Sequence, residues 1–104
     1  MPEFFTVSLL FLRLDDGTKK QLPYTYATAF QPTGNFSIVG NKDFPERGAI
    51  NIEGKEIIAV RYIGLEELLR GYDKIIDVID NQLVIGEKKG KYGAADIKKM
   101  EIIC

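Results

Sequence analysis

The sequence contains no histidine, and its one cysteine, Cys104, is the last residue. Without histidine the chain lacks the commonest general base near neutral pH, the usual zinc ligand and the Ser-His-Asp and Cys-His catalytic sets. A single cysteine excludes an internal disulfide, so the fold does not depend on an oxidising compartment. We therefore expect no catalytic, metal-binding or cofactor-binding set of residues, and we expect the protein not to be an enzyme.

The sequence also lacks an apolar run of the ~20 residues that a membrane span needs. The first three residues are without the basic start of a signal peptide, and Thr6, Ser8 and Arg13 interrupt the apolar stretch that follows. We expect a cytoplasmic protein that has no membrane partner.

Charge of one sign is not in excess, because the net charge of the 104 residues is -1. No global field therefore points to nucleic acid or to an anionic membrane. The distribution is uneven: residues 43–80 contain nine acidic and five basic side chains, whereas residues 87–99 contain two acidic and five basic ones. The length fits a single domain over residues 1–104 with one modest core.

The segment from Phe4 to Leu14 is predicted to be a strand, and from Leu9 to Leu12 both of its faces are apolar. A strand of this kind needs cover on both sides. The second cover has to come from a helix, from another sheet or from another chain, so Leu10 and Leu12 are candidate interface residues.

Further strands follow from alternating apolar residues and turn signals. They are predicted at Lys19–Phe30, Phe36–Val39, the hairpin Ala49–Ile63, and Ile97–Ile103. The aromatic residues on these strands are interpreted as core rather than as a platform for stacking bases.

The stretch from Leu65 to Ile79 fits two structures. Its apolar residues recur with the spacing of one helical face, which predicts a single helix reaching Ile79. Gly71 instead favours a short helix over residues 65–70 that ends at this glycine, which would adopt a left-handed conformation. A hairpin that turns at Asp80-Asn81 would then follow. The fold class is therefore α+β and mostly β, with about six to seven strands in a small barrel or a two-layer antiparallel sheet.

Two groups of side chains are candidates for a site. The first is lysine-rich and could bind a partner or a nucleic acid, although lysines that protect an edge strand are the favoured interpretation. It consists of Lys88, Lys89, Lys91, Tyr92, Lys98 and Lys99. The second, Asp73, Asp77 and Asp80, would form an acidic stripe on a long helix and could hold a hard cation, but a solvated face is favoured.

These observations favour a non-enzymatic interaction or assembly module that binds another protein or forms a homo-oligomer. Complementary charge blocks would set the register of such partners. The alternative is a small-barrel nucleic-acid-binding protein that uses the lysine-rich hairpin. A metal-dependent enzyme that uses Asp73 and Asp77 is the third hypothesis and the least favoured.

Overall fold

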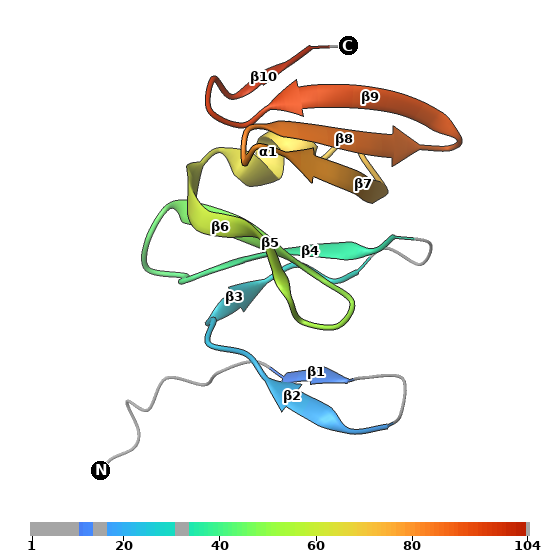
Figure 1. The fold of residues 1–104 in the computed structure, drawn as a ribbon. Helices are drawn as coiled ribbons and strands as arrows, with labels where there is room; N and C mark the ends of the chain where they lie inside the picture. Colours follow the sequence, from blue (N-terminus) through green and yellow to red (C-terminus); the bar gives the residue numbers. More distant parts are fainter. Residues whose placement is uncertain (1–10, 14–16, 31–33, 104) are drawn as a thin grey trace.

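The computed structural model describes residues 11–13, 17–30 and 34–103, which form stacked antiparallel β-layers with one short helix (Figure 1). The elements are β1 (Phe11–Arg13), β2 (Lys19–Gln21), β3 (Tyr26–Ala27), β4 (Phe36–Gly40), β5 (Glu46–Asn51), β6 (Glu56–Ile63), α1 (Leu65–Leu69), β7 (Lys74–Ile79), β8 (Leu83–Lys88), β9 (Lys91–Asp96) and β10 (Glu101–Ile102). β1 and β2 form a two-stranded N-terminal ribbon, β3-β4-β5-β6 the middle sheet, and β10-β9-β8-β7 the C-terminal sheet. The mostly β fold with one short helix is confirmed, and it consists of stacked sheets rather than a barrel.

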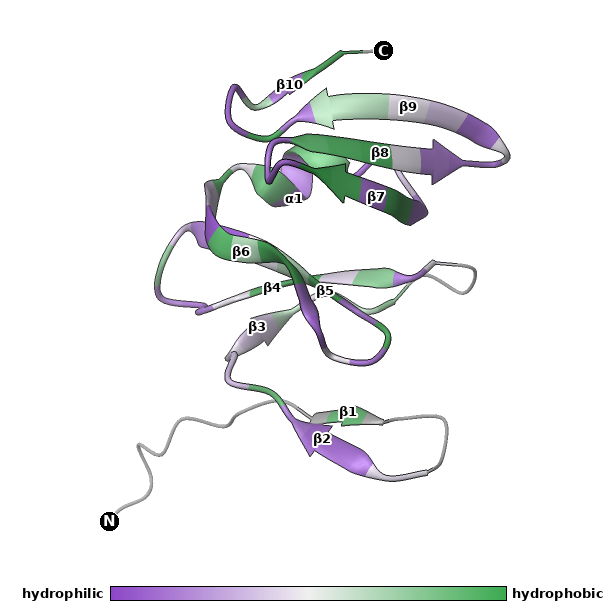
Figure 2. Cartoon of the chain, viewed as in Figure 1, coloured by the Kyte–Doolittle hydropathy of each residue, from purple (hydrophilic) through white to green (hydrophobic). Residues whose placement is uncertain are grey.

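The middle sheet is buried on both faces, because all five residues of β4 are buried. On one face Phe36 and Ile38 pack with α1 and the C-terminal sheet. This first core cluster consists of Phe36, Ile38, Ala49, Ile58, Leu65, Leu69, Ile75, Val84 and Ile97. On the other face Val39 and Ile50 pack with Leu22 and Tyr24, which follow the ribbon, in a second core cluster. In Figure 2 runs of apolar residues, coloured green, lie along α1, β7 and β8.

A strand with two buried faces is β4, and most of the predicted strand Phe4–Leu14 lies outside the described residues. Of the predicted strand Phe4–Leu14, the structure describes residues 11–13, which pair with Lys19–Gln21 in the N-terminal ribbon at the bottom of Figure 1. The ribbon covers the middle sheet instead of forming its centre.

The short helix followed by a hairpin is confirmed, and the long helix to Ile79 is excluded. The predicted left-handed conformation is absent at Gly71 and present at Gly64, which has a φ of 89° and begins α1. The amide of Tyr72 donates to the Leu69 carbonyl at 3.0 Å, so the chain turns back onto the helix. The Tyr72 ring lies against Gly86 of β8, where a Cβ would come within 2.5 Å of Cγ of the ring. Glycine at this position therefore makes room for the aromatic ring in the core.

Several other predicted strands are shorter than expected or divided. Lys19–Phe30 contains two strands of different layers, β2 and β3, because the chain crosses from the ribbon to the middle sheet around Pro23. Ile97–Ile103 begins with a turn in which Met100 has a φ of 54°, so that β10 starts at Glu101. The hairpin predicted at Ala49–Ile63 is confirmed as β5 and β6, and β5 starts three residues earlier, at Glu46.

β6 crosses β5 at Gly48, where the two backbones come unusually close. A Cβ at this position would lie 2.5 Å from the Ile58 carbonyl oxygen and 2.7 Å from the Val60 nitrogen. The register between β5 and β6 shifts on both sides of Ala49, which bends β6 over its neighbour. Any side chain at residue 48 would push the two strands apart.

We expect Gly48→Ala to lower the free energy of unfolding by about 2 kcal/mol, because backbone atoms on both sides have to move. Gly71→Ala is the matched control: a Cβ there has no atom within 4 Å, and φ is not positive. The control should be neutral or stabilise by about 0.4–1 kcal/mol through the unfolded state. Urea unfolding followed by circular dichroism measures both, and equal midpoints for the two variants would contradict this role of Gly48.

Candidate protein-interaction surface

The C-terminal sheet has one face in the first core cluster and one face turned away from it. Residues opposite each other in antiparallel strands share a face, so the register separates the two sets. Val84 is fully buried and pairs with Val78 and Ala95, which places these three on the inner face. The neighbouring residues Leu83 and Ile85 lie on the opposite face and belong to neither core cluster.

We call this opposite side the outer face. An apolar row crosses it, because Ile85 pairs with Ala94, and the Ile103 amide donates to the Ala94 carbonyl at 2.8 Å. At the β7 end of this row the register partner of Ile85 is the exposed Asp77, and Ile76 precedes it at a register shift that follows Ile75. Ile79 pairs with Leu83 beside it. The apolar residues of the outer face are Ile76, Ile79, Leu83, Ile85, Ala94 and Ile103.

The C-terminal sheet is the uppermost layer of Figure 1, and no other strand or helix is drawn above it. Ile76 is 49% exposed and Ile103 is 54% exposed, although both lie beside other apolar residues. Leu83 and Ile85 are half-buried by their neighbours within the sheet. The outer face is therefore partly apolar and exposed at its two ends, whereas Ala94 in its centre is 8% exposed and Asp77 adds a charge at the β7 end.

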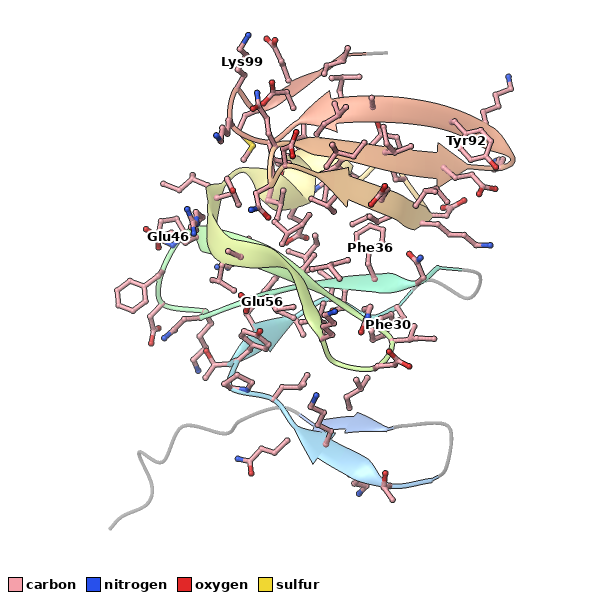
Figure 3. All side chains as sticks on the ribbon, in the orientation of Figure 1. Phe30, Phe36, Glu46, Glu56, Tyr92 and Lys99 are labelled. Atoms are coloured by element: carbon pink, nitrogen blue, oxygen red, sulfur yellow. The ribbon has the colours of Figure 1, made fainter. Side chains whose placement is uncertain are left out.

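The lysine-rich group predicted from the sequence is divided between the two ends of β9. Lys88 pairs with Lys91 next to a tight turn in which Lys89 and Gly90 have φ values of 50° and 82°. Lys98 and Lys99 follow the opposite end, about 20 Å away along a six-residue strand. Figure 3 shows Tyr92 and Lys99 at the two ends of the sheet.

Tyr92 is the aromatic residue at the lysine-rich turn. It pairs with Glu87, which places it on the outer face, and it is 70% exposed. The turn therefore brings together Lys88, Lys89, Lys91 and Tyr92, and it does not bring Lys98 and Lys99 to them.

Of the two leucines proposed as an interface, Leu12 packs against buried residues of its own chain. It contacts the second core cluster, which includes Leu22 and Val39. Leu10 lies outside the described residues. The middle sheet therefore shields part of the Leu12 side chain from solvent.

The free edge of β7 is closed to strand pairing. The Asn35 carboxamide forms two hydrogen bonds with Ile75, donating from Nδ2 to the carbonyl and accepting the amide at Oδ1, both at 2.9 Å. The Val78 amide donates to Oδ1 of Asp77 at 2.8 Å. Together with the register shift after Ile75, these contacts occupy three of the main-chain groups with which an added strand could pair.

The other edges are short or bent. β3 and β10 have two residues each, and β6 bends over Gly48. Two adjoining hollows of about 420 and 280 Å³ lie along the open side between β6 and β7, and they share Ile57 and Val78 in their linings. Bends and bulges are the features with which sheets prevent edge pairing.

Two tyrosine–carboxylate hydrogen bonds join the elements around the cores. Tyr24 donates to Glu56 at 2.6 Å, and Tyr26 donates to Glu66 at 2.5 Å while the Arg47 guanidinium lies 4.1 Å from its ring centre. Burial, with the Glu56 hydrogen bond, raises the pKa of Tyr24, and the Glu66 hydrogen bond raises that of Tyr26. Both hydroxyls thus stay protonated donors near neutral pH, which suits cross-links between elements.

Asp96 holds the turn that carries Lys98 and Lys99. It is 7% exposed and accepts hydrogen bonds from Gln82 Nε2 at 2.8 Å and from the amides of Lys98 and Lys99 at 2.9 and 3.0 Å. The Gln82 bond and the two amide bonds hold the pKa of Asp96 below its usual value. The carboxylate therefore fixes the end of β9 opposite the lysine-rich turn.

Comparison of this chain with protein-family models, with curated proteins and with solved structures finds no match. In the described part of the chain, no helix is long and apolar enough to cross a membrane. Within the same residues, no group of three or more histidine, cysteine or acidic side chains is placed to hold a metal ion. Asp73, Asp77 and Asp80 lie before, in and after β7 rather than on a helix.

The sequence contains one spacing pattern that indicates the outer face and that the residue types alone do not reveal. Ile76, Ile85, Ala94 and Ile103 recur every nine residues. Such a spacing is typical of one face of successive hairpins of equal length.

We expect Asp96→Asn to lower the urea midpoint at pH 7, because the amide replaces a charged acceptor of three hydrogen bonds. Since the pKa of Asp96 is lowered in the folded state, its contribution is present above an unfolded value of about 3.9 and is lost as the pH falls further. The difference between wild type and variant should therefore shrink below about pH 4. Asp43→Asn, at an exposed loop position, is the control. A difference that persists unchanged at pH 2–3 would contradict this assignment.

Proposed function

We propose that this chain is a non-enzymatic protein-interaction module that binds through the outer face of its C-terminal sheet. The observation that carries the proposal is the apolar row Ile85, Ala94 and Ile103 on the side of the C-terminal sheet turned away from the first core cluster, with Ile76 beside Asp77 at its β7 end. Exposed apolar surface of this kind is characteristic of sites where a partner binds.

The edges of the sheets support docking by a face rather than by strand addition. Each described edge strand is short, bulged or bonded to a side chain, so the main chain offers few free groups for a partner strand. The outer face has no comparable protection. A partner would therefore gain affinity from apolar contacts and register from the charges around them.

The charges around the face are available for that purpose. The described residues form one ion pair, between Arg70 and Glu67 at 3.1 Å, which lies on α1 and its end. The lysines of the β8–β9 turn lie at one end of the sheet, and the exposed Asp80 lies at the other end, where Arg61 and Lys98 line the same hollow. Long-range attraction from such groups raises association rates and selects the partner.

Ile76→Lys tests the proposal by placing a charge at the β7 end of the apolar row. Residue 76 is 49% exposed, so the fold should tolerate the change, and association with partner proteins or with itself should weaken about tenfold or more. Ile52→Lys is the matched control, since Ile52 is 51% exposed at the β5–β6 turn of another layer. The measurements are sedimentation of the purified protein and quantitative co-purification from an extract of its source cells. Complexes that are unaffected by Ile76→Lys would refute the proposal.

Nucleic-acid binding is the alternative, and the exposed Tyr92 beside Lys88, Lys89 and Lys91 is the observation that favours it. One aromatic ring and three lysines could stack a base and contact phosphates. Binding to single-stranded RNA or DNA should then fall steeply between about 50 and 200 mM salt and be lost in Tyr92→Ala with Lys91→Ala. Titration of labelled oligonucleotides measures this, and no binding at low salt would remove the alternative.

A further inference from the structure

We infer that a pocket between the middle sheet and α1 binds a free α-amino acid that has an apolar side chain. The inference goes beyond the proposed function, because the pocket shares no residue with the outer face. Three features of the described residues lead to it: an apolar floor of suitable size, two opposite charges on the rim that do not pair with each other, and the fixed position of the negative one.

The floor of the pocket is apolar and belongs to the first core cluster. It consists of Phe36 and Ile38 of β4, Leu69 of α1, and Tyr72. Figure 3 shows Phe36 above β4, in the space between the middle sheet and the C-terminal sheet. The volume of the pocket is about 210 Å³. An apolar cavity of about 150 Å³ holds one benzene molecule, so a phenyl or a branched aliphatic side chain fits here.

The rim of the pocket carries one charge of each sign. Glu66 and Arg70 both line it, and they are neighbours on α1 and its end because they are four positions apart. Within the described chain the one ion pair joins Arg70 to Glu67 instead, at 3.1 Å, and these two side chains are 67% and 74% exposed. An exposed pair of this kind is weak, and it leaves other N–H donors of the guanidinium available.

The Glu66 carboxylate is held in position by the middle sheet. Its Oε1 accepts a hydrogen bond from the Tyr26 hydroxyl at 2.5 Å, and the Arg47 guanidinium lies 4.1 Å from the centre of the Tyr26 ring. Nη1 of Arg47 donates to three main-chain carbonyls between residues 41 and 46, and Arg47 does not line the pocket. No group of the described residues donates to Oε2 of Glu66, so this oxygen can accept from a ligand.

These features select a molecule that carries both charges close together on an apolar body. In a free α-amino acid the ammonium group, the carboxylate and the side chain are all attached to one carbon atom. The Cβ atoms of residues four apart in a helix are about 5–6 Å from each other, a gap that the two charged groups bridge. In the proposed complex the ammonium contacts Glu66, the carboxylate contacts Arg70, and the side chain lies on the apolar floor.

Isothermal titration calorimetry of the wild-type chain with L-phenylalanine and three relatives tests the inference. Phenethylamine lacks the carboxylate, 3-phenylpropionate lacks the ammonium, and glycine lacks the side chain. L-Phenylalanine should bind about threefold more tightly than phenethylamine, since Arg70 is exposed and its contact is weak. It should bind about tenfold or more tightly than 3-phenylpropionate or glycine.

Two results of these titrations overturn the inference. The first is a failure of both L-phenylalanine and L-leucine to bind at concentrations up to about 10 mM. The second is binding of phenethylamine or 3-phenylpropionate as tight as that of L-phenylalanine, because the pocket would then not recognise both charges.

Glu66→Gln and the matched control Glu67→Gln locate the site. The amide of Glu66→Gln keeps an oxygen that can accept from Tyr26, but it loses the charge, so L-phenylalanine should bind about tenfold more weakly. Glu67 lies on the same helix without lining the pocket, and its variant should bind within about threefold of the wild type. Urea midpoints close to that of the wild type show that both variants are folded.

Equal affinities of the two variants for L-phenylalanine would overturn the assignment of Glu66. Ile76→Lys lies in another layer and should bind L-phenylalanine as the wild type does. A protein complex that Ile76→Lys abolishes, together with no binding of amino acids, would leave the interaction module standing and remove this inference alone.

Discussion

Burial of the middle sheet on both faces is the constraint that positions the other elements. Ile38 and Val39 are adjacent in β4, so their side chains point to opposite sides, and both are almost completely buried. Each fully buried side chain of this size contributes about 1.5–3 kcal/mol relative to an exposed one, so neither face can be left in water. One face requires α1 and the C-terminal sheet, and the other requires the segment around Leu22 and Tyr24 that follows the N-terminal ribbon.

The same constraint explains why the partly apolar outer face lies where it does. In a stack, the central layer takes its cover from both neighbours, whereas an end layer receives cover on one side. The C-terminal sheet is such an end layer, and Val84 and Ile75 satisfy its inner face. If the outer face followed the usual alternation it would be polar, yet Ile76, Ile79 and Ile85 occupy it. Packing within the described chain does not require these residues, which is why we propose binding as their role.

The local elements were predictable from the sequence, and their places in the stack were not. The β7–β8 hairpin follows from Asp80-Asn81, because both residues adopt positive φ and these residue types tolerate it. Periodicity also shows that a strand has two apolar faces, but it does not say which strand is central. Phe36–Gly40 is only five residues long and contains a polar residue, Ser37. The buried Ser37 hydroxyl is satisfied because its Oγ donates to the Thr28 carbonyl at 2.6 Å. A hydrogen bond of this kind cannot be recognised in a sequence.

The candidate surface was harder to predict, since it depends on strand length and register rather than on residue type. Lys91 and Lys98 are seven residues apart in the sequence, and a straight strand between them separates them to the two ends of the sheet. Ile76 and Ile103 are 27 positions apart, yet three turns and a register shift bring them to opposite ends of one sheet.

A surface assembled in this way has a consequence for specificity. Strand edges recognise any extended backbone, whereas an apolar face with charged ends recognises only a surface of matching pattern. The contacts of Asn35 and the register shift make strand addition at the β7 edge less favourable. In the proposed module the Asn35 hydrogen bonds would serve recognition as well as stability, because without them Ile75 would offer an amide and a carbonyl to any unpaired strand.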